Sequence, residues 1–261
     1  MSSVLHTDQL GRKVEVPISP RRIVSIVPSQ TELLYHLGLH EEVVGITKFC
    51  IHPEVWFKTK TRVGGTKQLH LDKIRELKPD LILANKEEND VEQIRTLCKE
   101  FPVWISDIRN LEESLAMILS VGEITDRIEK SQQLIGEIQL AADSLHPAKN
   151  RTAAYFIWND PLMSVNRDTF IHAMMKHAGF INVFVGREDS RYPIISEQDL
   201  IDANPEIVLL SSEPFPFEQK HADYFQSILP DSKVLLVDGE MFSWYGSRLV
   251  HSFDYFATLW K

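Results

Sequence analysis

The stretches DKIRELKPDLIL (72–83) and QDLIDANPEIVL (198–209) share one pattern, and that pattern decides the fold. When Pro79 is placed over Pro205, each stretch reads as a short amphipathic helix, a proline that ends the helix, and an apolar strand. An earlier strand precedes each proline by a similar distance. The repeat therefore predicts two related α/β lobes.

Both lobes are expected to contain parallel strands that are buried on both faces. Runs such as RIVSIVPS (22–29) and PVWIS (102–106) are apolar without alternation, and helical patterns lie between them. From residue 111 to residue 145 apolar side chains recur at steps near 3.6, which predicts helices with a break near Gly122. The second of these, from about residue 125 to residue 146, is predicted to be a single long helix between the lobes.

The predicted organisation is an N-terminal lobe (1–122), a linking helix (123–148) and a C-terminal lobe (149–261). The fold class is α/β, with two Rossmann-like lobes whose sheets are mainly parallel. Ligands of such sheets bind at the carboxyl ends of the strands. We therefore expect a ligand cleft between the lobes, lined by the loops that follow the strands.

Composition excludes several classes of function. The chain has 261 residues and a net charge of −9, which argues against a nucleic acid or an anionic membrane as its partner. The segment MSSVLHTDQLGRKV at the start of the sequence lacks the pattern of a secretory signal, which favours a cytoplasmic location. The two cysteines, Cys50 and Cys98, are expected to be free thiols, and the protein is expected to be a monomer.

Aromatic side chains are concentrated in the loops that are expected to follow strands. Their large apolar area is suited to the walls of a binding site for a partly apolar ligand. Lys86, in the loop NKEEN (85–89), can add a hydrogen bond at the ligand's rim, unless this loop is simply solvated. The aromatic candidates are Phe49, Trp158, Phe215, Phe217, Phe242, Trp244 and Tyr245.

The stretch ITKFCIHP (46–53) places Cys50 two residues before His52. A catalytic thiol needs a base that a third group orients, and the nearby sequence offers no paired acid. A zinc site would need two more ligands, and no local spacing supplies them. We therefore predict neither an enzyme nor a metal site. Both residues are expected to line the ligand site, where either one can reach the metal of a bound chelate.

Several segments together resemble one family of transport proteins. They are TDQLGRKVEVPISPRRIVSIVPSQTELLYHLG (7–38), LDKIRELKPDLILA (71–84), the long helix, and GSRLVHSF (246–253). In this order they resemble the substrate-binding proteins of ABC importers for cobalamin, ferric siderophores and haem, and cobalamin-binding proteins most closely. The resemblance implies a non-enzymatic protein with no covalent cofactor. Its ligand would be cobalamin or an iron chelate.

The resemblance also implies roles for individual residues. Phe49 stands where these proteins carry an aromatic ligand contact, and Thr66 stands where they carry a tryptophan. The segment EMFSW matches the one that packs on the corrin. Within it Phe242 keeps the aromatic character, Met241 replaces an aromatic residue, and Trp244 replaces a basic one.

The family docks on its membrane permease through one surface acid in each lobe, seven residues before the proline of the repeat. These positions hold Asp72 and Gln198, and Glu197 is an acid beside the second. The implied partner is an ABC permease, and the family is mostly periplasmic or lipoprotein-anchored. One alternative is a cytoplasmic carrier or sensor of corrinoids or metal chelates without a permease. The other is an enzyme that uses Cys50 and His52.

Overall fold

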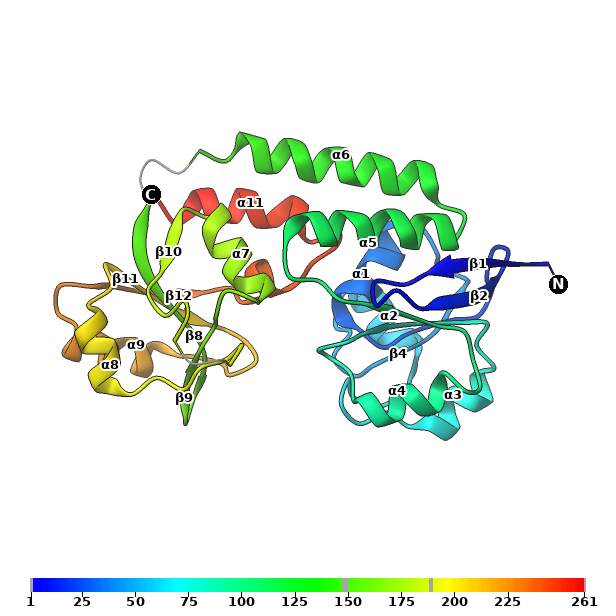
Figure 1. The fold of residues 1–261 in the computed structure, drawn as a ribbon, viewed down its shortest axis with the longest axis horizontal. Coiled ribbons are helices and arrows are strands. Elements are labelled where there is room, and N and C mark those ends of the chain that lie inside the picture. Colours follow the sequence, from blue (N-terminus) through cyan, green and yellow to red (C-terminus); the bar gives the residue numbers. More distant parts are fainter. Residues whose placement is uncertain (1, 147–149, 188–189, 261) are drawn as a thin grey trace. The chain divides into compact units, whose positions relative to one another are not determined.

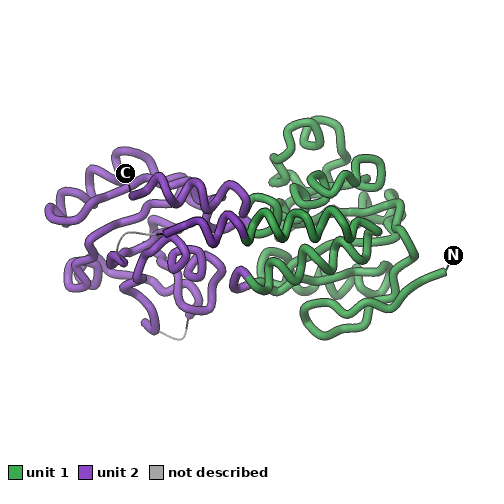
Figure 2. The backbone as a smooth tube through the Cα atoms, turned by 90° about the horizontal axis from the view of Figure 1, so that it is seen from above, with its two compact units in different colours: residues 1–108, 112–139, 245–248 green, residues 109–111, 140–244, 249–261 purple. Residues whose placement is uncertain are grey.

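The computed structural model describes residues 2–146, 150–187 and 190–260, and the chain divides into two compact units (Figure 2). The long helix that was predicted as a separate linker is divided between the units after residue 139, and the predicted boundary after residue 148 lies outside the described residues. Unit 1 consists of residues 1–108, 112–139 and 245–248, and unit 2 of residues 109–111, 140–244 and 249–261.

In unit 1, the described residues form a five-stranded sheet in the order β5-β4-β3-β6-β7, in which every pair is parallel. An antiparallel hairpin, β1–β2, precedes this sheet (Figure 1). The strands are β1 (Ser3–Thr7), β2 (Lys13–Pro17), β3 (Ile23–Ser25), β4 (Val43–Ile46), β5 (Thr61–Arg62), β6 (Leu81–Asn85) and β7 (Val103–Ser106). The helices are α1 (Pro28–His36), α2 (Glu54–Thr59), α3 (Leu71–Leu77), α4 (Val91–Leu97), α5 (Leu111–Ile124) and α6 (Ile128–Ser144), the last of which continues into unit 2.

In unit 2, the described residues form a parallel sheet in the order β10-β8-β11-β12, and β9 pairs with β8 in the antiparallel direction. The strands are β8 (Arg151–Asn159), β9 (Leu162–Ser164), β10 (Phe180–Asn182), β11 (Ile207–Ser211) and β12 (Lys233–Val237). The helices are α7 (Phe170–His177), α8 (Glu197–Ala203), α9 (Gln219–Ile228), α10 (Glu240–Ser243) and α11 (Leu249–Thr258).

The predicted internal repeat is confirmed in local detail. Helices α3 and α8 end at Lys78 and Asn204, which take left-handed backbone conformations with φ of 46° and 39°. A proline follows each of them and then a buried strand, β6 or β11. The next residues, Asp80 and Glu206, use their carboxylates to accept backbone N–H bonds from the chain at the start of β3 and β8. The two halves therefore repeat both the elements and the way that the elements are joined.

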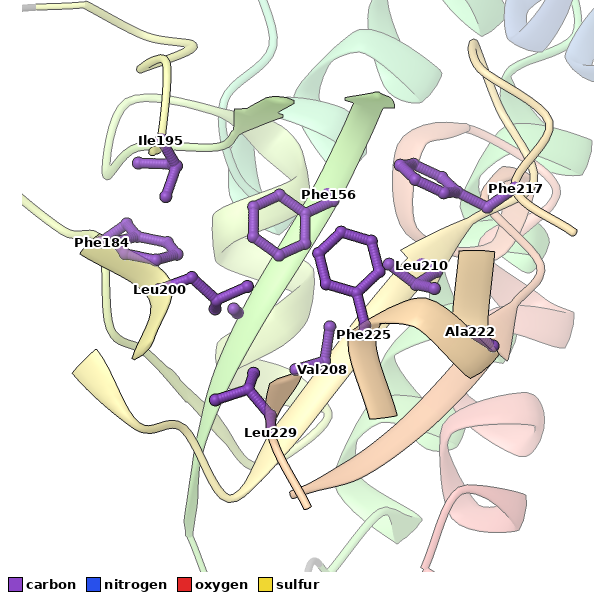
Figure 3. Close-up of a cluster of buried hydrophobic side chains, with 11 residues drawn as sticks. Phe156, Phe184, Ile195, Leu200, Val208, Leu210, Phe217, Ala222, Phe225 and Leu229 are labelled. Atoms are coloured by element: carbon purple, nitrogen blue, oxygen red, sulfur yellow. The ribbon is translucent and has the colours of Figure 1, made fainter. Parts of the chain in front are cut away.

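Each sheet buries a hydrophobic core under two helices. In unit 1 the side chains of α3 and α4 pack on β3, β6 and β7. In unit 2 the side chains of α8 and α9 pack on β8 and β11, with Phe156 and Phe225 stacked at a ring separation of 5.5 Å (Figure 3). Burial of these aromatic and branched side chains is the main stabilising term of each unit.

Two sequence predictions differ from the structure in detail, and a third is confirmed. The strand that was predicted over residues 22–29 is limited to β3, because Pro28 begins helix α1. The predicted break in the helical stretch is confirmed between α5 and α6, where Asp126 has a φ of 58°. The segment after Trp158 was expected to be a loop but contains strand β9, which folds back on β8.

Candidate functional site

The carboxyl edge of each sheet has the geometry of a ligand-binding edge. Leaving out β5 and β9, both sheets order their four strands as second, first, third, fourth along the chain. The chain leaves the first strand towards one side of the sheet and the third strand towards the other. The position between these two strands is the switch point, where ligands of open parallel sheets bind. In unit 1 it lies after β3 and β6, and in unit 2 after β8 and β11. The functional side chains are therefore expected in the loops that follow these strands.

Phe49 is exposed in the loop after β4 of unit 1. Half of its side chain surface is accessible, at 50%. The ammonium group of Lys48 lies 5.0 Å from the ring centroid, and a Cβ atom on Gly65 would come within 3.1 Å of Cε2 of the ring. The ring thus lies beside the turn that carries Thr66, which is half-buried. The two positions that the resemblance pairs as ligand contacts are neighbours in unit 1.

Cys50, by contrast, is fully buried in unit 1. The hydroxyl of Thr31 donates to Sγ at 3.1 Å, and the hydroxyl of Thr47 also lies 3.1 Å from this atom. Burial raises the pKa of the Cys50 thiol to about 11, although these hydroxyl contacts lower it. At neutral pH the sulfur is therefore a protonated thiol, which is neither a strong nucleophile nor a good metal ligand. His52 is half-buried in the same loop.

The loop after β6 is held by two asparagines that the sequence interpretation did not single out. The side-chain oxygen of Asn85 accepts the backbone N–H groups of Glu87 and Glu88, at 2.8 and 3.0 Å. The Asn89 amide donates to the carbonyl groups of Ile26 and Thr66, both at 3.1 Å. An asparagine at the end of a strand is a recognisable turn signal. These two side chains fix the loop against the neighbouring edge segments.

Lys86 and Tyr245 have opposite environments at this edge of unit 1. Lys86 is exposed and forms an ion pair with Asp107 at 2.8 Å. Tyr245 is buried, and its hydroxyl donates to a carboxylate oxygen of Glu88 at 2.8 Å. Burial and the charge of Glu88 raise the pKa of Tyr245 well above its ordinary range. Tyr245 is thus a neutral hydrogen-bond donor that fixes the loop containing Glu88.

An aromatic cluster lies at the carboxyl edge of unit 2. The rings of Trp158, at the end of β8, and Phe215, after β11, meet edge to face at 5.8 Å. Phe215 in turn meets Phe217 at 4.9 Å. Trp158 is exposed, whereas Phe217 belongs to the hydrophobic core (Figure 3). Of the three, Trp158 and Phe215 present apolar surface at this edge.

The segment 240–244 contributes more to packing than the sequence indicated. Phe242 is fully buried and contacts the rings of Tyr155 and Phe256 at 5.1 and 4.7 Å. Met241 is half-buried. Trp244 is also largely buried, and its indole N–H donates to the carboxylate of Glu213 at 3.1 Å. Glu213 was not identified from the sequence, because nothing in the pattern SSEPFPF marks its acid as half-buried and bonded to an indole.

The acids expected to face a permease differ in their surroundings. Asp72 on α3 is highly exposed and accepts a bond from Arg75 at 2.8 Å. Glu197 on α8 accepts a bond from the hydroxyl of Tyr224. Gln198 donates to Asp202 at 2.8 Å. In unit 2 the exposed face of α8 is thus still acidic beside the position where the family's acid is replaced by glutamine.

The described residues contain neither a cluster of metal ligands nor a membrane-spanning helix. Within residues 2–146, 150–187 and 190–260, no three His, Cys, Asp or Glu side chains gather as a metal site requires. None of the helices in those ranges combines the length and hydropathy of a transmembrane span.

Comparison with known proteins agrees with this architecture. A Vitamin B12-binding protein of Pectobacterium atrosepticum is 26% identical over 243 residues, which cover 88% of this chain and 85% of that protein. An uncharacterized ABC transporter substrate-binding lipoprotein of Bacillus subtilis is 23% identical over 96% of this chain and 83% of its own length. The resemblance found in the sequence is thereby confirmed at the level of the class.

The fold is also that of a solved binding protein. The periplasmic heme-binding protein RhuT from Roseiflexus sp. RS-1 matches with a TM-score of 0.79 at 19% identity, over 92% of this chain and 98% of its own. The predicted fold class, two α/β lobes with mainly parallel sheets, is confirmed. A family model described as a periplasmic binding protein matches residues 23–228, from β3 of unit 1 to α9 of unit 2. This chain therefore belongs to the periplasmic binding protein family.

Proposed function

We propose that this chain binds a metal chelate outside the cytoplasmic membrane and delivers it to an ABC importer. A corrinoid of the cobalamin type is the first ligand to test. A similar protein named for vitamin B12 supports this ligand, and a similar protein named as an ABC transporter substrate-binding lipoprotein supports the transport role. Nothing in these comparisons supports the cytoplasmic location that the first residues favoured.

The observation that carries the proposal is exposed aromatic surface at the carboxyl edge of each unit. Phe49 is 50% exposed in unit 1, and Trp158 is 39% exposed in unit 2, where its ring meets Phe215. Packing of each unit does not require large apolar side chains to be exposed at a ligand-binding edge. Covering each one with a flat, partly apolar ligand would stabilise a complex by about 1.5–3 kcal/mol.

The polar groups at the same edges are suited to orienting such a ligand rather than to reacting with it. Lys86, which pairs with Asp107, and the half-buried His52 are polar side chains in the loops of unit 1. The buried, protonated Cys50 thiol opposes the alternative of a Cys/His enzyme. Haem and iron siderophores remain in the proposed ligand class, because the fold is shared with a heme-binding protein.

The proposed permease contacts are the exposed acids Asp72 of unit 1 and Glu197 of unit 2. Each lies on one of the two repeat-related helices. A permease surface with two arginines would complement them. We expect Asp72→Ala and Glu197→Ala to leave ligand affinity unchanged and to weaken delivery to the membrane complex.

Isothermal titration with cyanocobalamin, haemin and a ferric siderophore tests the ligand-binding proposal. For the ligand that binds, Phe49→Ala and Trp158→Ala are each expected to weaken affinity by roughly 10- to 100-fold, as lost apolar contact implies. Leu5→Ala, which removes a 61% exposed side chain from hairpin strand β1, is the matched control and should leave affinity unchanged. Equal affinities for all four proteins would contradict the assignment of these edges.

A further inference from the structure

The carboxylate of Glu213 joins two loops at the carboxyl edge of the unit 2 sheet. Its Oε1 atom accepts a hydrogen bond from the indole N–H of Trp244 at 3.1 Å and another from the hydroxyl of Ser243. Glu213 follows strand β11, whereas Ser243 and Trp244 lie at the end of helix α10, which follows β12. One carboxylate oxygen thus connects the loop that carries Phe215 to the segment that carries Trp244.

The surroundings of Glu213 fix it in place. Its backbone N–H donates to Oγ of Ser211 at 3.2 Å, and its carbonyl oxygen accepts from the same hydroxyl at 2.6 Å. A Cβ atom on Gly239 would lie only 2.6 Å from Cγ of Glu213 and 2.3 Å from Oγ of Ser211. The side chain is therefore packed directly against backbone, and only glycine leaves room for it.

The charges around Glu213 are of its own sign. Burial raises the pKa of its carboxyl group, and the nearby carboxylates of Glu240 and Asp238 raise it further. The bonds from Ser243 and Trp244 act in the opposite direction because they stabilise the ionised form. This carboxyl group therefore takes up a proton at a higher pH than an ordinary glutamate does.

We propose that Glu213 is a positioning residue for ligand binding, whose ionised form fixes the indole of Trp244. When the carboxylate is protonated, the indole N–H loses a charge-assisted acceptor, and bonds of that kind are about twice as strong as neutral ones. Ligand affinity then falls by about 3- to 10-fold, the range expected for one weakened hydrogen bond. This inference rests on the proposed function, and it adds to the ligand-binding edge of unit 2 the segment that carries Trp244, which follows the carboxyl end of β12.

The first test observes Trp244 without any ligand. The chain has five tryptophans, and Trp244→Phe assigns the one indole N–H resonance of Trp244 in a ¹H–¹⁵N spectrum. In the wild type this resonance is expected to shift with pH, with a midpoint above the ordinary glutamate pKa of about 4.3. In Glu213→Gln, which keeps the shape of the side chain but cannot ionise, the shift should be absent.

The second test measures affinity for cyanocobalamin from pH 5 to pH 9 in the same proteins. The wild type should bind more weakly as the pH falls, and the midpoint pH of this loss of affinity should equal that of the indole shift. Glu213→Gln should lose the pH dependence of affinity. Glu218→Gln is the matched control, because it removes one carboxylate from the end of the same loop, where Glu218 pairs with Lys220. It should retain the wild-type profile.

The outcomes are distinguishable. An indole resonance that does not titrate, or that titrates equally in Glu213→Gln, overturns the positioning role. An indole that titrates while affinity stays constant with pH shows that Glu213 holds Trp244 without affecting the ligand, which also overturns it. A titrating indole in a protein that binds neither cyanocobalamin, haemin nor a ferric siderophore overturns the proposed function on which the inference rests.

Discussion

At the scale of single residues, burial decides which polar groups can act. Cys50 and Phe49 are neighbours in the chain, yet Phe49 is half exposed and Cys50 has no accessible surface. Cys50 belongs to the core of unit 1, where two hydroxyl groups contact its sulfur and burial raises its pKa. The chemistry suggested by the pattern Cys-x-His is therefore less relevant to function than the apolar ring beside it.

Cys50 should be unreactive in the folded protein. In Cys98→Ser, where Cys50 is the remaining thiol, a disulfide reagent at pH 8 is expected to label the native protein far more slowly than the unfolded protein. The reason is that a buried thiol with a pKa of about 11 supplies little accessible thiolate at that pH. Rapid labelling of the native variant would contradict the burial of Cys50 and would revive the catalytic alternative.

Glu213 should make stability depend on pH in a defined direction. A carboxyl group whose pKa is raised by folding binds protons more tightly in the folded state, so its contribution to stability is lost as pH rises from the unfolded value towards the folded one. Glu213→Gln should therefore gain stability relative to the wild type between about pH 4.3 and the raised value, and keep that gain at higher pH.

Urea unfolding of both proteins at pH 4.5 and pH 8 checks this expectation. The difference in unfolding free energy, Glu213→Gln minus wild type, should be more positive at pH 8. A difference that does not change with pH, or that changes in the opposite direction, would show that folding does not raise the pKa of Glu213.

At the scale of elements, the helix–proline–strand repeat was the most predictive part of the sequence. Lys78 and Asn204 end equivalent helices in the same left-handed conformation, and the following prolines prevent the helices from continuing. The end of each helix depends on local backbone preferences, which can be read from a single sequence. Strand β9 could not be predicted in this way, because its pairing with β8 depends on the tertiary structure of unit 2.

The candidate site was predictable only in part, for a related reason. The positions of Phe49 and Phe215 after strands, and of Trp158 at the end of a strand, could be inferred, because strand ends are visible in the sequence. Their exposure, and the burial of Phe242 and Cys50, depend on what packs against them in three dimensions. The role of Glu213 likewise depends on a glycine and an indole that lie far from it in the chain.

The close contact between α5 and α6 can be tested at Gly122, with the helical Gly136 as the control. A Cβ atom on Gly122 would lie 2.2 Å from Oγ of Ser131, whereas one on Gly136 would meet nothing within 4 Å. Gly122→Ala is expected to destabilise the protein by about 1–3 kcal/mol through overpacking. Gly136→Ala is expected to stabilise it by about 0.5–1 kcal/mol, since alanine favours the helix.

Thermal or urea unfolding of these two variants measures the difference directly. Both changes replace a helical glycine with alanine, so intrinsic helix propensity alone would make both of them stabilising. A stabilised Gly122→Ala protein would contradict the close contact between α5 and α6.

At the scale of the whole molecule, the chain consists of two units with the same strand order, and each carries exposed aromatic surface at its carboxyl edge. The chain belongs to the periplasmic binding protein family, and we propose that both edges contact its solute. The net charge of −9 is compatible with that role and provides no general attraction for nucleic acid.

The central claim is that the purified protein binds a metal chelate reversibly, and equilibrium dialysis against cyanocobalamin, haemin and a ferric siderophore tests it most directly. We expect saturable binding of one ligand per chain for at least one of the three, with cyanocobalamin first. We also expect the bound ligand to be recovered chemically unchanged. Failure of all three to bind at concentrations up to about 1 mM, or recovery of a converted product, would contradict the account.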